Sequence, residues 1–329
     1  MEKQRYNIVV TGVGALIGQG IIKGLRQVDG VVIYGVDRVI SPYAKNLVDV
    51  ALQKPDCDEE SGSYLEFWAK LIVEQKIDLI LPGISLDMYF FDANRDVFAN
   101  YDVKIVLNDQ DLIKNARDKY IFDGVYKRSG LPNIPTARPD SWKHAIDILG
   151  AAPLLLKPRF GEGSTGIARL LDEVDFKYWT QKSADNWIIQ KIIGSDTEEY
   201  TVGIFGLGDG TASAPIIFRR KLSRSGYTQD AEVVMSDLLN DFIKKIVTYF
   251  KPIGPTNLQF RLEDNIPYLL EINPRFSSSC SLRYAFGFNE AAMCVEYYLN
   301  NKSPSDATIK FGRAQRYNED YISYVSDII

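Results

Sequence analysis

The stretch "PYLLEINPRFSSS", residues 267–279, decides how this sequence is interpreted. An apolar run ends in Glu271, Asn273 and Arg275, which are spaced two residues apart. Alternate residues of a strand point to the same face, so these three polar side chains look into one space. That face is either a salt-bridged strand end in solvent or one wall of a site that holds something charged.

The preceding strand, "NLQFRL", brings a further oxygen ligand beside this face through Gln259. Carboxylate and amide oxygens suit Mg²⁺, which usually keeps waters and binds through one or two carboxylates together with substrate phosphates. Gln259, Glu271 and Asn273 are therefore candidate metal ligands. Arg275, on the same face, can hold a phosphate or a carboxylate through two parallel hydrogen bonds.

A second polar segment, "LLLKPRFGEGSTGI", reads as two strands joined by a glycine-rich loop. Lys157 ends the first strand and offers a point charge for a phosphate. The loop contains Gly161, Gly163, Ser164, Thr165 and Gly166. Backbone N–H groups and hydroxyls of such a loop can fold over an anion, and we favour this role over an ordinary hairpin turn. It is not a Walker A loop, because no Lys-Ser/Thr pair follows the last glycine.

A third segment, "VVTGVGALIGQG", places Gly12, Gly14 and Gly18 in a strand-to-helix turn. Such glycines either let the backbone approach a phosphate at a helix N-terminus or allow tight packing of strand against helix. Asp37 ends the next strand, where a ribose-binding acid stands in a dinucleotide-binding fold. The spacing GxGxxxG departs from the dinucleotide pattern GxGxxG, so this segment leaves both readings open.

Composition excludes several classes of protein. The chain has 329 residues and a formal net charge of −5 without a basic block, which argues against a dedicated nucleic-acid binder. Three cysteines without CxxC spacing and a single histidine, His144, exclude a disulfide framework and a multi-histidine metal site. No apolar run approaches about 18 residues, so we expect no membrane span and a cytoplasmic location.

The order of elements predicts two kinds of sheet. Strands alternate with helices over the first hundred residues, which is typical of a doubly wound parallel α/β sheet. Later strands follow one another with turn signals and therefore belong to antiparallel sheets of an α+β region. We place the boundaries at 1–112 for a Rossmann-like domain, 113–188 for a small central subdomain with the glycine loop, and 189–329 for a C-terminal subdomain with the metal site.

Five segments in this order resemble the ATP-grasp superfamily, particularly the large subunit of carbamoyl phosphate synthetase and its short stand-alone relatives. They are "GVGALIGQG", "NARDKYIF", "LLLKPRFGEGSTGI", "IIQKIIGSDTEEYTV" and "NLQF" with "YLLEINPRFS". The resemblance covers nearly the whole chain. It implies a pre-ATP-grasp domain followed by an ATP-grasp fold, with ATP and Mg²⁺ or Mn²⁺ as cofactors.

The resemblance also implies roles for individual residues. Lys119 and Lys157 would bind the ATP phosphates, and the loop 161–166 would close over them. The adenine would meet Gln190 and the backbone of Lys191 and Ile193, and the ribose hydroxyls would meet Glu199 or, as a second choice, Glu198. Gln259, Glu271 and Asn273 would hold the metal. Arg275 would neutralise the transferring phosphoryl group, with Arg219 or Arg220 also facing the phosphates.

The activity implied is an ATP-dependent carboxylate–amine ligase that forms an amide through an acylphosphate. A sugar acid or nucleotide-linked sugar acid joined to an amino acid is one substrate class, and dipeptide formation is the competitor. Substrate contacts are expected at Gly14, Ser277, Ser278 and Arg283. The resemblance favours a homodimer through the N-terminal domain. An NAD-dependent reductase or epimerase, favoured by Asp37, and a non-catalytic nucleotide-binding protein are the alternatives of another class.

Overall fold

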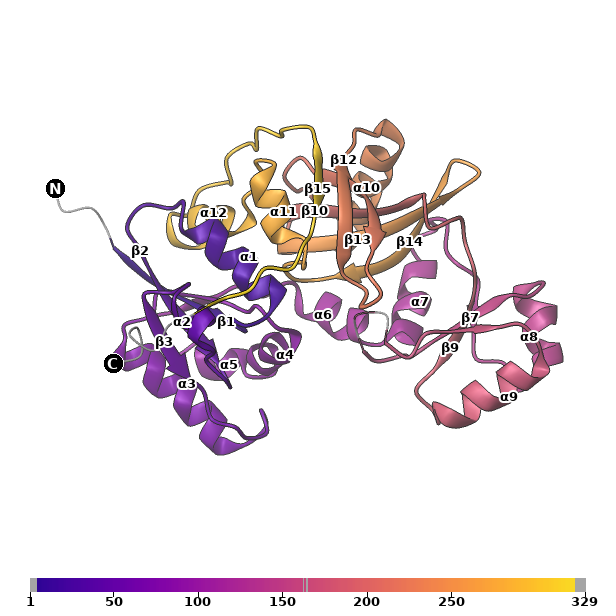
Figure 1. Ribbon diagram of the computed structural model, residues 1–329, viewed down its shortest axis with the longest axis horizontal. Coiled ribbons are helices and arrows are strands. Elements are labelled where there is room, and N and C mark those ends of the chain that lie inside the picture. Colours follow the sequence, from indigo (N-terminus) through magenta and orange to yellow (C-terminus); the bar gives the residue numbers. More distant parts are fainter. Residues whose placement is uncertain (1–4, 162, 164, 323–329) are drawn as a thin grey trace.

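The computed structural model describes residues 5–161, 163 and 165–322. Figure 1 shows the N-terminal domain at one end of the long axis and a small subdomain at the other, with the largest sheet lying between them.

The N-terminal domain is built on a parallel sheet with strand order β3-β2-β1-β4-β5. Its strands are β1 (Tyr6–Thr11), β2 (Val31–Asp37), β3 (Val50–Gln53), β4 (Leu79–Leu81) and β5 (Lys104–Ile105). Its helices are α1 (Leu16–Leu25), α2 (Pro42–Lys45), α3 (Gly62–Glu74), α4 (Ser85–Ala93) and α5 (Arg95–Phe98). Ile8 and Val10 pack on the α1 side, whereas Val9 packs with α3 and α4. The doubly wound sheet is confirmed.

The turn from β1 into α1 is closed by glycine packing. Gly12 has φ +63°, a left-handed conformation that side chains other than glycine rarely adopt. A Cβ added to Gly18 would lie 2.2 Å from the carbonyl oxygen of Gly12, so helix and strand touch backbone to backbone. Gly12 and Gly18 therefore serve the close strand–helix contact that the sequence left open.

Two short helices lead from this domain to the small subdomain. They are α6 (Gln110–Arg117) and α7 (Lys119–Lys127), and Asp118 between them caps α7 through the backbone N–H groups of Tyr120 and Ile121. The small subdomain contains β6 (Thr136–Ala137), α8 (Trp142–Leu149), β7 (Leu154–Lys157), β8 (Ala168–Leu170), α9 (Glu173–Lys182) and β9 (Ile188–Lys191). Its antiparallel strands run in the order β6-β9-β7-β8 and enclose a core of their own.

The C-terminal sheet is antiparallel, with strand order β14-β13-β10-β11-β12-β15. Its strands are β10 (Glu199–Leu207), β11 (Ile216–Leu222), β12 (Thr228–Val233), β13 (Ile253–Glu263), β14 (Ile266–Asn273) and β15 (Arg313–Gln315). The helices beside it are α10 (Asp237–Phe250), α11 (Cys280–Ala285), α12 (Glu290–Cys294) and the π-helical turn η1 (Val295–Leu299). The expected antiparallel sheets are thus confirmed.

The two faces of this sheet have different partners. Val202 and Ile204 of β10 pack with α10 in one core. Glu199 and Thr201 lie an odd number of residues from Val202, so they point to the opposite face, because side chains alternate along a strand. On that opposite face the sheet is apolar near Phe205 and polar toward Glu199, and the polar part carries the candidate site.

Helix α1 packs directly on α11 and α12. A Cβ at Gly20 would lie 2.2 Å from Cys280 Sγ, and one at Gly24 would lie 2.5 Å from Asn289 Oδ1. These two glycines, one helical turn apart, let the helices approach closely. As a result, one apolar core contains side chains of the parallel sheet, α1, the C-terminal sheet and α12.

Among the residues that the structure describes, no helix has the length and apolar character needed to cross a membrane.

Candidate nucleotide and metal site

The hairpin β13–β14 brings the candidate metal ligands together. Asp264 and Asn265 form its tight turn with φ of 51° and 59°, values that Asp and Asn tolerate better than most residues. A register shift beyond Gln259 sets this residue directly opposite Glu271. Opposed residues on one face of an antiparallel pair have neighbouring side chains, so the spacing of polar residues along β14 becomes a cluster across two strands.

All three candidate ligands meet at one oxygen. Glu271 Oε1 accepts hydrogen bonds from the side-chain amides of Gln259 and Asn273, the latter at 2.9 Å. The three side chains are partly exposed, so the cluster is open to a ligand. Turning over the amides would present their oxygens instead of their nitrogens, since an amide side chain carries both. This donor set fits Mg²⁺, which prefers oxygen ligands, with Glu271 as its one carboxylate.

Lys157 from the small subdomain faces this cluster. It ends β7, and its environment includes the charges of Glu271, Lys119 and Glu199. Burial lowers the pKa of Lys157 to about 8, and the nearby positive charges of Lys119 and Arg261 act in the same direction. The carboxylate of Glu271 opposes this decrease. A lysine held in this way gains strongly from an anion such as a phosphate.

The glycine loop lies against Lys119. Lys119 Nζ donates to the carbonyl oxygen of Gly161 at 2.8 Å, and the backbone N–H of Lys119 donates to the carbonyl oxygen of Arg159. Gly161, Gly163 and Gly166 all have positive φ, and Thr165 is exposed. Ser164, the remaining predicted phosphate ligand of this loop, lies outside the described residues.

Arg159 and Asp118 tie the loop to the start of α7, which we did not predict. Arg159 Nε donates to Asp118 Oδ1 at 3.2 Å, and its Nη2 donates to Asp118 Oδ2. The same Arg159 guanidinium lies over the rings of Tyr120 and Phe160. The "DK" of "NARDKYIF" was the available signal for Asp118, but its pairing with a residue 41 positions away depends on the tertiary fold.

Strand β9, which leads into the hinge segment, offers a buried acceptor on Gln190. Gln190 Nε2 donates to Thr136 Oγ1 at 2.8 Å, and within the described residues Gln190 Oε1 is buried without a hydrogen-bond partner. Ile193 is buried, and its carbonyl oxygen accepts a long bond of 3.4 Å from Arg261. Lys191 is exposed and donates its backbone N–H to Pro135.

Glu199 is enclosed by two arginines. It is 5% exposed and forms buried ion pairs with Arg220 and with Arg261, each at 2.8–2.9 Å. Glu198 points to the other face of the strand, where its carboxylate accepts the hydroxyl hydrogen of Tyr200. Arg261, which the sequence did not single out, thus connects the hinge to the sheet.

The two neighbouring arginines of β11, Arg219 and Arg220, have different partners. Arg220 bonds to Glu199 and to the amide oxygen of Gln259, so it belongs to the polar face. Arg219 pairs instead with Glu232, well away from that set.

Arg275 reaches across to the N-terminal domain. Its Nε donates to Ser85 Oγ at 2.9 Å, and its Nη1 donates to the carbonyl oxygen of Phe276 at 2.8 Å. Ser85 begins α4 at the carboxyl edge of the parallel sheet, so the segment that follows β14 contacts the N-terminal domain here. The sequence signal available for Ser85 was its position just after the strand "IDLILPG", at the carboxyl edge of the predicted parallel sheet, where ligands bind in such folds.

The four predicted substrate contacts lie in different surroundings. Ser277 is buried and its hydroxyl accepts the N–H of Ser279, whereas Ser278 is partly exposed. Arg283 is fully buried, pairs with Glu290 at 2.9 Å and donates to Asn257. Arg283 is therefore held in a buried ion pair and has no exposed surface at which a substrate could contact it.

The remaining predicted contact, Gly14, already has an anionic partner. Its N–H donates to Asp37 Oδ2 at 3.0 Å, and Asp37 also accepts the N–H of Arg38. A phosphate at this turn would have to compete with that carboxylate.

Comparisons with known proteins agree with this architecture. Residues 184–320, which include the hinge and the hairpin, match a family model described as "ATP-grasp in the biosynthetic pathway with Ter operon". Over these residues the chain is similar to the ATP-grasp family.

Among curated proteins, the chain is similar to the large chain of carbamoyl phosphate synthase. The one from Methanosarcina barkeri is 27% identical over 237 residues, which cover 65% of this chain and 22% of the relative. The one from Nostoc sp. is 23% identical over 286 residues, which cover 78% and 26% of the two chains. This chain therefore spans about a quarter of the length of those relatives.

Solved structures share the fold at low sequence identity. The biotin carboxylase domain of Hydrogenobacter thermophilus 2-oxoglutarate carboxylase has a TM-score of 0.74 at 14% identity, over 95% of this chain and 74% of that one. N5-carboxyaminoimidazole synthetase from Staphylococcus aureus, complexed with ADP, has 0.72 at 16% identity over 94% and 82%. L-amino acid ligase from Bacillus licheniformis has 0.67 at 15% identity over 92% and 76%.

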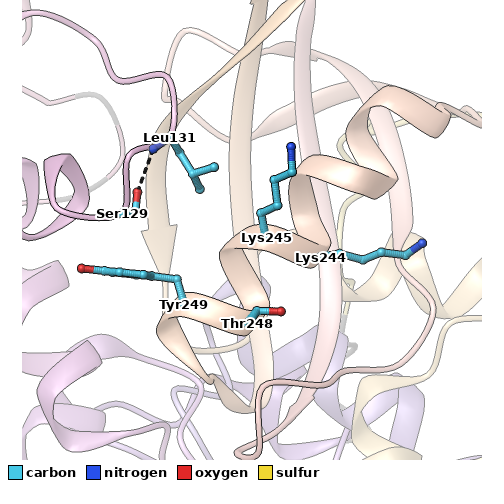
Figure 2. A pocket seen from close by; sticks show the side chains of 6 residues that line it. All are labelled: Ser129, Leu131, Lys244, Lys245, Thr248 and Tyr249. Carbon is cyan, nitrogen blue, oxygen red and sulfur yellow. Dashed lines mark hydrogen bonds between the residues drawn. The ribbon is translucent and has the colours of Figure 1, made fainter.

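A separate groove of about 540 Å³ lies on the α10 side of the C-terminal sheet, and Figure 2 shows it from close by. It is lined by Ser129, Leu131, Lys244, Lys245, Thr248 and Tyr249. Helix α10 covers the sheet face opposite the polar cluster, so this groove is distinct from the candidate site. In the described part of the chain, no three His, Cys, Asp or Glu side chains gather into a metal-binding group, which leaves the mixed carboxylate–amide cluster as the candidate.

Proposed function

We propose that this protein is an ATP- and Mg²⁺-dependent carboxylate–amine ligase that forms an amide through an acylphosphate. The observation that carries the proposal is the cluster of Glu271, Gln259 and Asn273 on the β13–β14 hairpin, where the charge of Glu271 acts on Lys157 of the small subdomain. A cation for phosphate and a carboxylate for a metal, from two subdomains, thus lie close enough to influence each other electrostatically. The fold shared with an ADP complex and with an L-amino acid ligase supports the same reading.

The chemistry follows from the weakness of a carboxylate as an electrophile. Transfer of the γ-phosphoryl group of ATP to a carboxylate oxygen gives an acylphosphate and ADP; an amine then attacks the acyl carbon, and phosphate leaves. Glu271, Asn273 and Gln259 would hold Mg²⁺, which would neutralise phosphate charge and orient the phosphoryl group. Lys157, Lys119 and Arg275 would supply the remaining positive charge, and the glycine loop would keep water from the acylphosphate.

One contact distinguishes the two candidate classes of carboxylate substrate. Because Asp37 already accepts the N–H of Gly14, a further anion at this turn would meet a negative charge. We therefore favour an unphosphorylated amino acid over a nucleotide-linked sugar acid as the carboxylate substrate. Ser278 and the N-terminal edge near Ser85 are the proposed surroundings of that substrate. By resemblance, we also propose a homodimer, which light scattering would test.

The test is a screen for ADP and phosphate release from ATP, with carboxylic acids crossed with amines and nucleotide-sugar acids included. We expect turnover only when acid and amine are both present. Glu271→Gln removes the one carboxylate of the metal cluster and should abolish that turnover. The matched control is Glu232→Gln, which removes a carboxylate that pairs with Arg219 and Arg313 on the outer strands. Equal turnover in both variants would refute the assignment.

A further inference from the structure

We infer that Arg316 binds a carboxylate of the substrate and so determines which acids the protein accepts. The inference deepens the proposed function and rests on it, because it takes the segment after β14 as the surroundings of the substrate. Arg283, the arginine that the sequence offered for substrate contact, is buried in its ion pair with Glu290. Arg316, which the sequence did not single out, lies beside the same segment.

Arg316 contacts the chain shortly after the metal hairpin. Its Nη2 donates to the carbonyl oxygen of Ser278 and, at 3.4 Å, to the hydroxyl of Ser281. Ser278 is partly exposed and lies three residues after Arg275, the proposed partner of the phosphoryl group. A ligand held by Arg316 would therefore lie beside the place where the acylphosphate is proposed to form.

The guanidinium of Arg316 lacks a counterion. Within the residues that the structure describes, Arg316 forms no ion pair, and its Nε is buried without a hydrogen-bond partner. The neighbours that act on its charge are Cys280 and Tyr227, neither of which is a carboxylate. Burial raises the pKa of the Cys280 thiol to about 12, so this neighbour is neutral at pH 7. Burial also lowers the pKa of Arg316, as expected for a cation that is enclosed without an anion.

The other arginines on the strands of this sheet are all paired. Each of them meets a carboxylate: Arg219 and Arg313 meet Glu232, and Arg220 and Arg261 meet Glu199. A partly buried cation without an anion is unfavourable, and an anionic ligand at Arg316 would relieve this without breaking an existing pair. A carboxylate fits the position, because its hydrogen bonds with a guanidinium are charged on both sides.

The backbone around Arg316 is held on both sides. Arg316 follows β15 directly; its N–H donates to the carbonyl oxygen of Gln229 at 2.8 Å, and Gln229 Nε2 donates to the carbonyl oxygen of Arg316 at 2.5 Å. Further along, Tyr321 accepts a hydrogen bond from Asn46, beside α2 of the N-terminal domain. Figure 1 shows this segment running from β15 toward α1 and α2. Because the segment is anchored at both ends, a ligand has little ordering of the chain to drive.

The experiment follows thermal unfolding of the full chain with Mg²⁺–ADP while one acid at a time is titrated, using the proteinogenic amino acids and glucuronate. A ligand that binds the native state raises the midpoint. We expect at least one acid to raise it, and the carboxamide of that acid to bind about tenfold more weakly. No shift with any acid, or equal binding of the carboxamide, would overturn the inference while leaving the nucleotide site intact. Failure of Mg²⁺–ADP to bind would overturn the proposed function, and the inference with it.

Arg316→Gln tests the residue itself. It should weaken binding of that acid about tenfold, because it removes the charge from the hydrogen bond, and should leave the dissociation constant of Mg²⁺–ADP unchanged. If this variant does not fold, Arg316→Lys replaces it and should weaken binding more than threefold, since an ammonium does not reproduce the planar guanidinium. The matched control is Arg313→Gln, which removes an arginine that already pairs with Glu232 and should bind the acid like wild type. A folded Arg316 variant that binds the acid within threefold of wild type would overturn the assignment.

Discussion

Raising the pH from 7 to 9 should weaken nucleotide binding about tenfold, through the titration of Lys157. In the free protein, burial lowers the pKa of this side chain to about 8. Its protonated fraction therefore falls from about nine-tenths at pH 7 to about one-tenth at pH 9. A phosphate binds the ammonium form, so the bound state keeps the proton over this range and the apparent affinity follows the protonated fraction.

The direction of the effect follows from the same linkage. The folded-state pKa lies below the ordinary lysine value of 10.5, because burial disfavours the charge and Lys119 repels it. Nucleotide binding reverses that shift, so the complex takes up a proton. At pH 8.5 the uptake should be about 0.8 proton per nucleotide, as measured by calorimetry in two buffers of different ionisation enthalpy.

Lys157→Arg provides the control, since arginine keeps its charge throughout this range. Its dissociation constant for Mg²⁺–ADP should change less than twofold between pH 7 and pH 9. The reasoning would be refuted by a wild-type constant that is flat over the same range. An equally steep dependence in the arginine variant would also refute it, because another group would then be responsible.

Two further substitutions test how the fold is held together. Arg283→Met should lower the free energy of unfolding by about 3–5 kcal/mol in urea, because it leaves the buried carboxyl of Glu290 without its partner; a loss below 1 kcal/mol would contradict this pairing. Gly20→Val should lower it by about 1–3 kcal/mol, since even a Cβ there would lie 2.2 Å from Cys280 Sγ. An unchanged thermal midpoint for that variant would mean that the contact of α1 with α11 is looser than described.

The main strands were predictable because their residues are apolar along continuous runs. Tyr6–Thr11 and Val31–Asp37 form central strands of the parallel sheet, buried on both faces, and their sequences show it. The strands not predicted lie at or next to sheet edges; they are Val50–Gln53, Thr136–Ala137, Thr228–Val233 and Arg313–Gln315. Each has partly exposed residues that dilute the apolar signal.

Only the part of the candidate site that depends on residue spacing along a single strand could be predicted from the sequence. Glu271 and Asn273 sit two residues apart, and the structure places them together with Gln259. The pairing of Glu199 with Arg261 depends on the register of two strands that lie about sixty residues apart in sequence, which no local pattern encodes. Arg283 carries the same charge as a surface arginine, and only the packing of α11 reveals that it is buried.

The contact of α1 with α11 and α12 has a consequence for anyone who wishes to build chimeras from this chain. A chimera that takes only residues 1–112 of this chain would contain α1 but would lack α11 and α12, the helices against which Gly20 and Gly24 pack. The transplantable unit is therefore discontinuous and joins the first domain to residues 276–295. Residues 136–191, by contrast, form a contiguous piece around a separate core, so this is the part that can be exchanged alone.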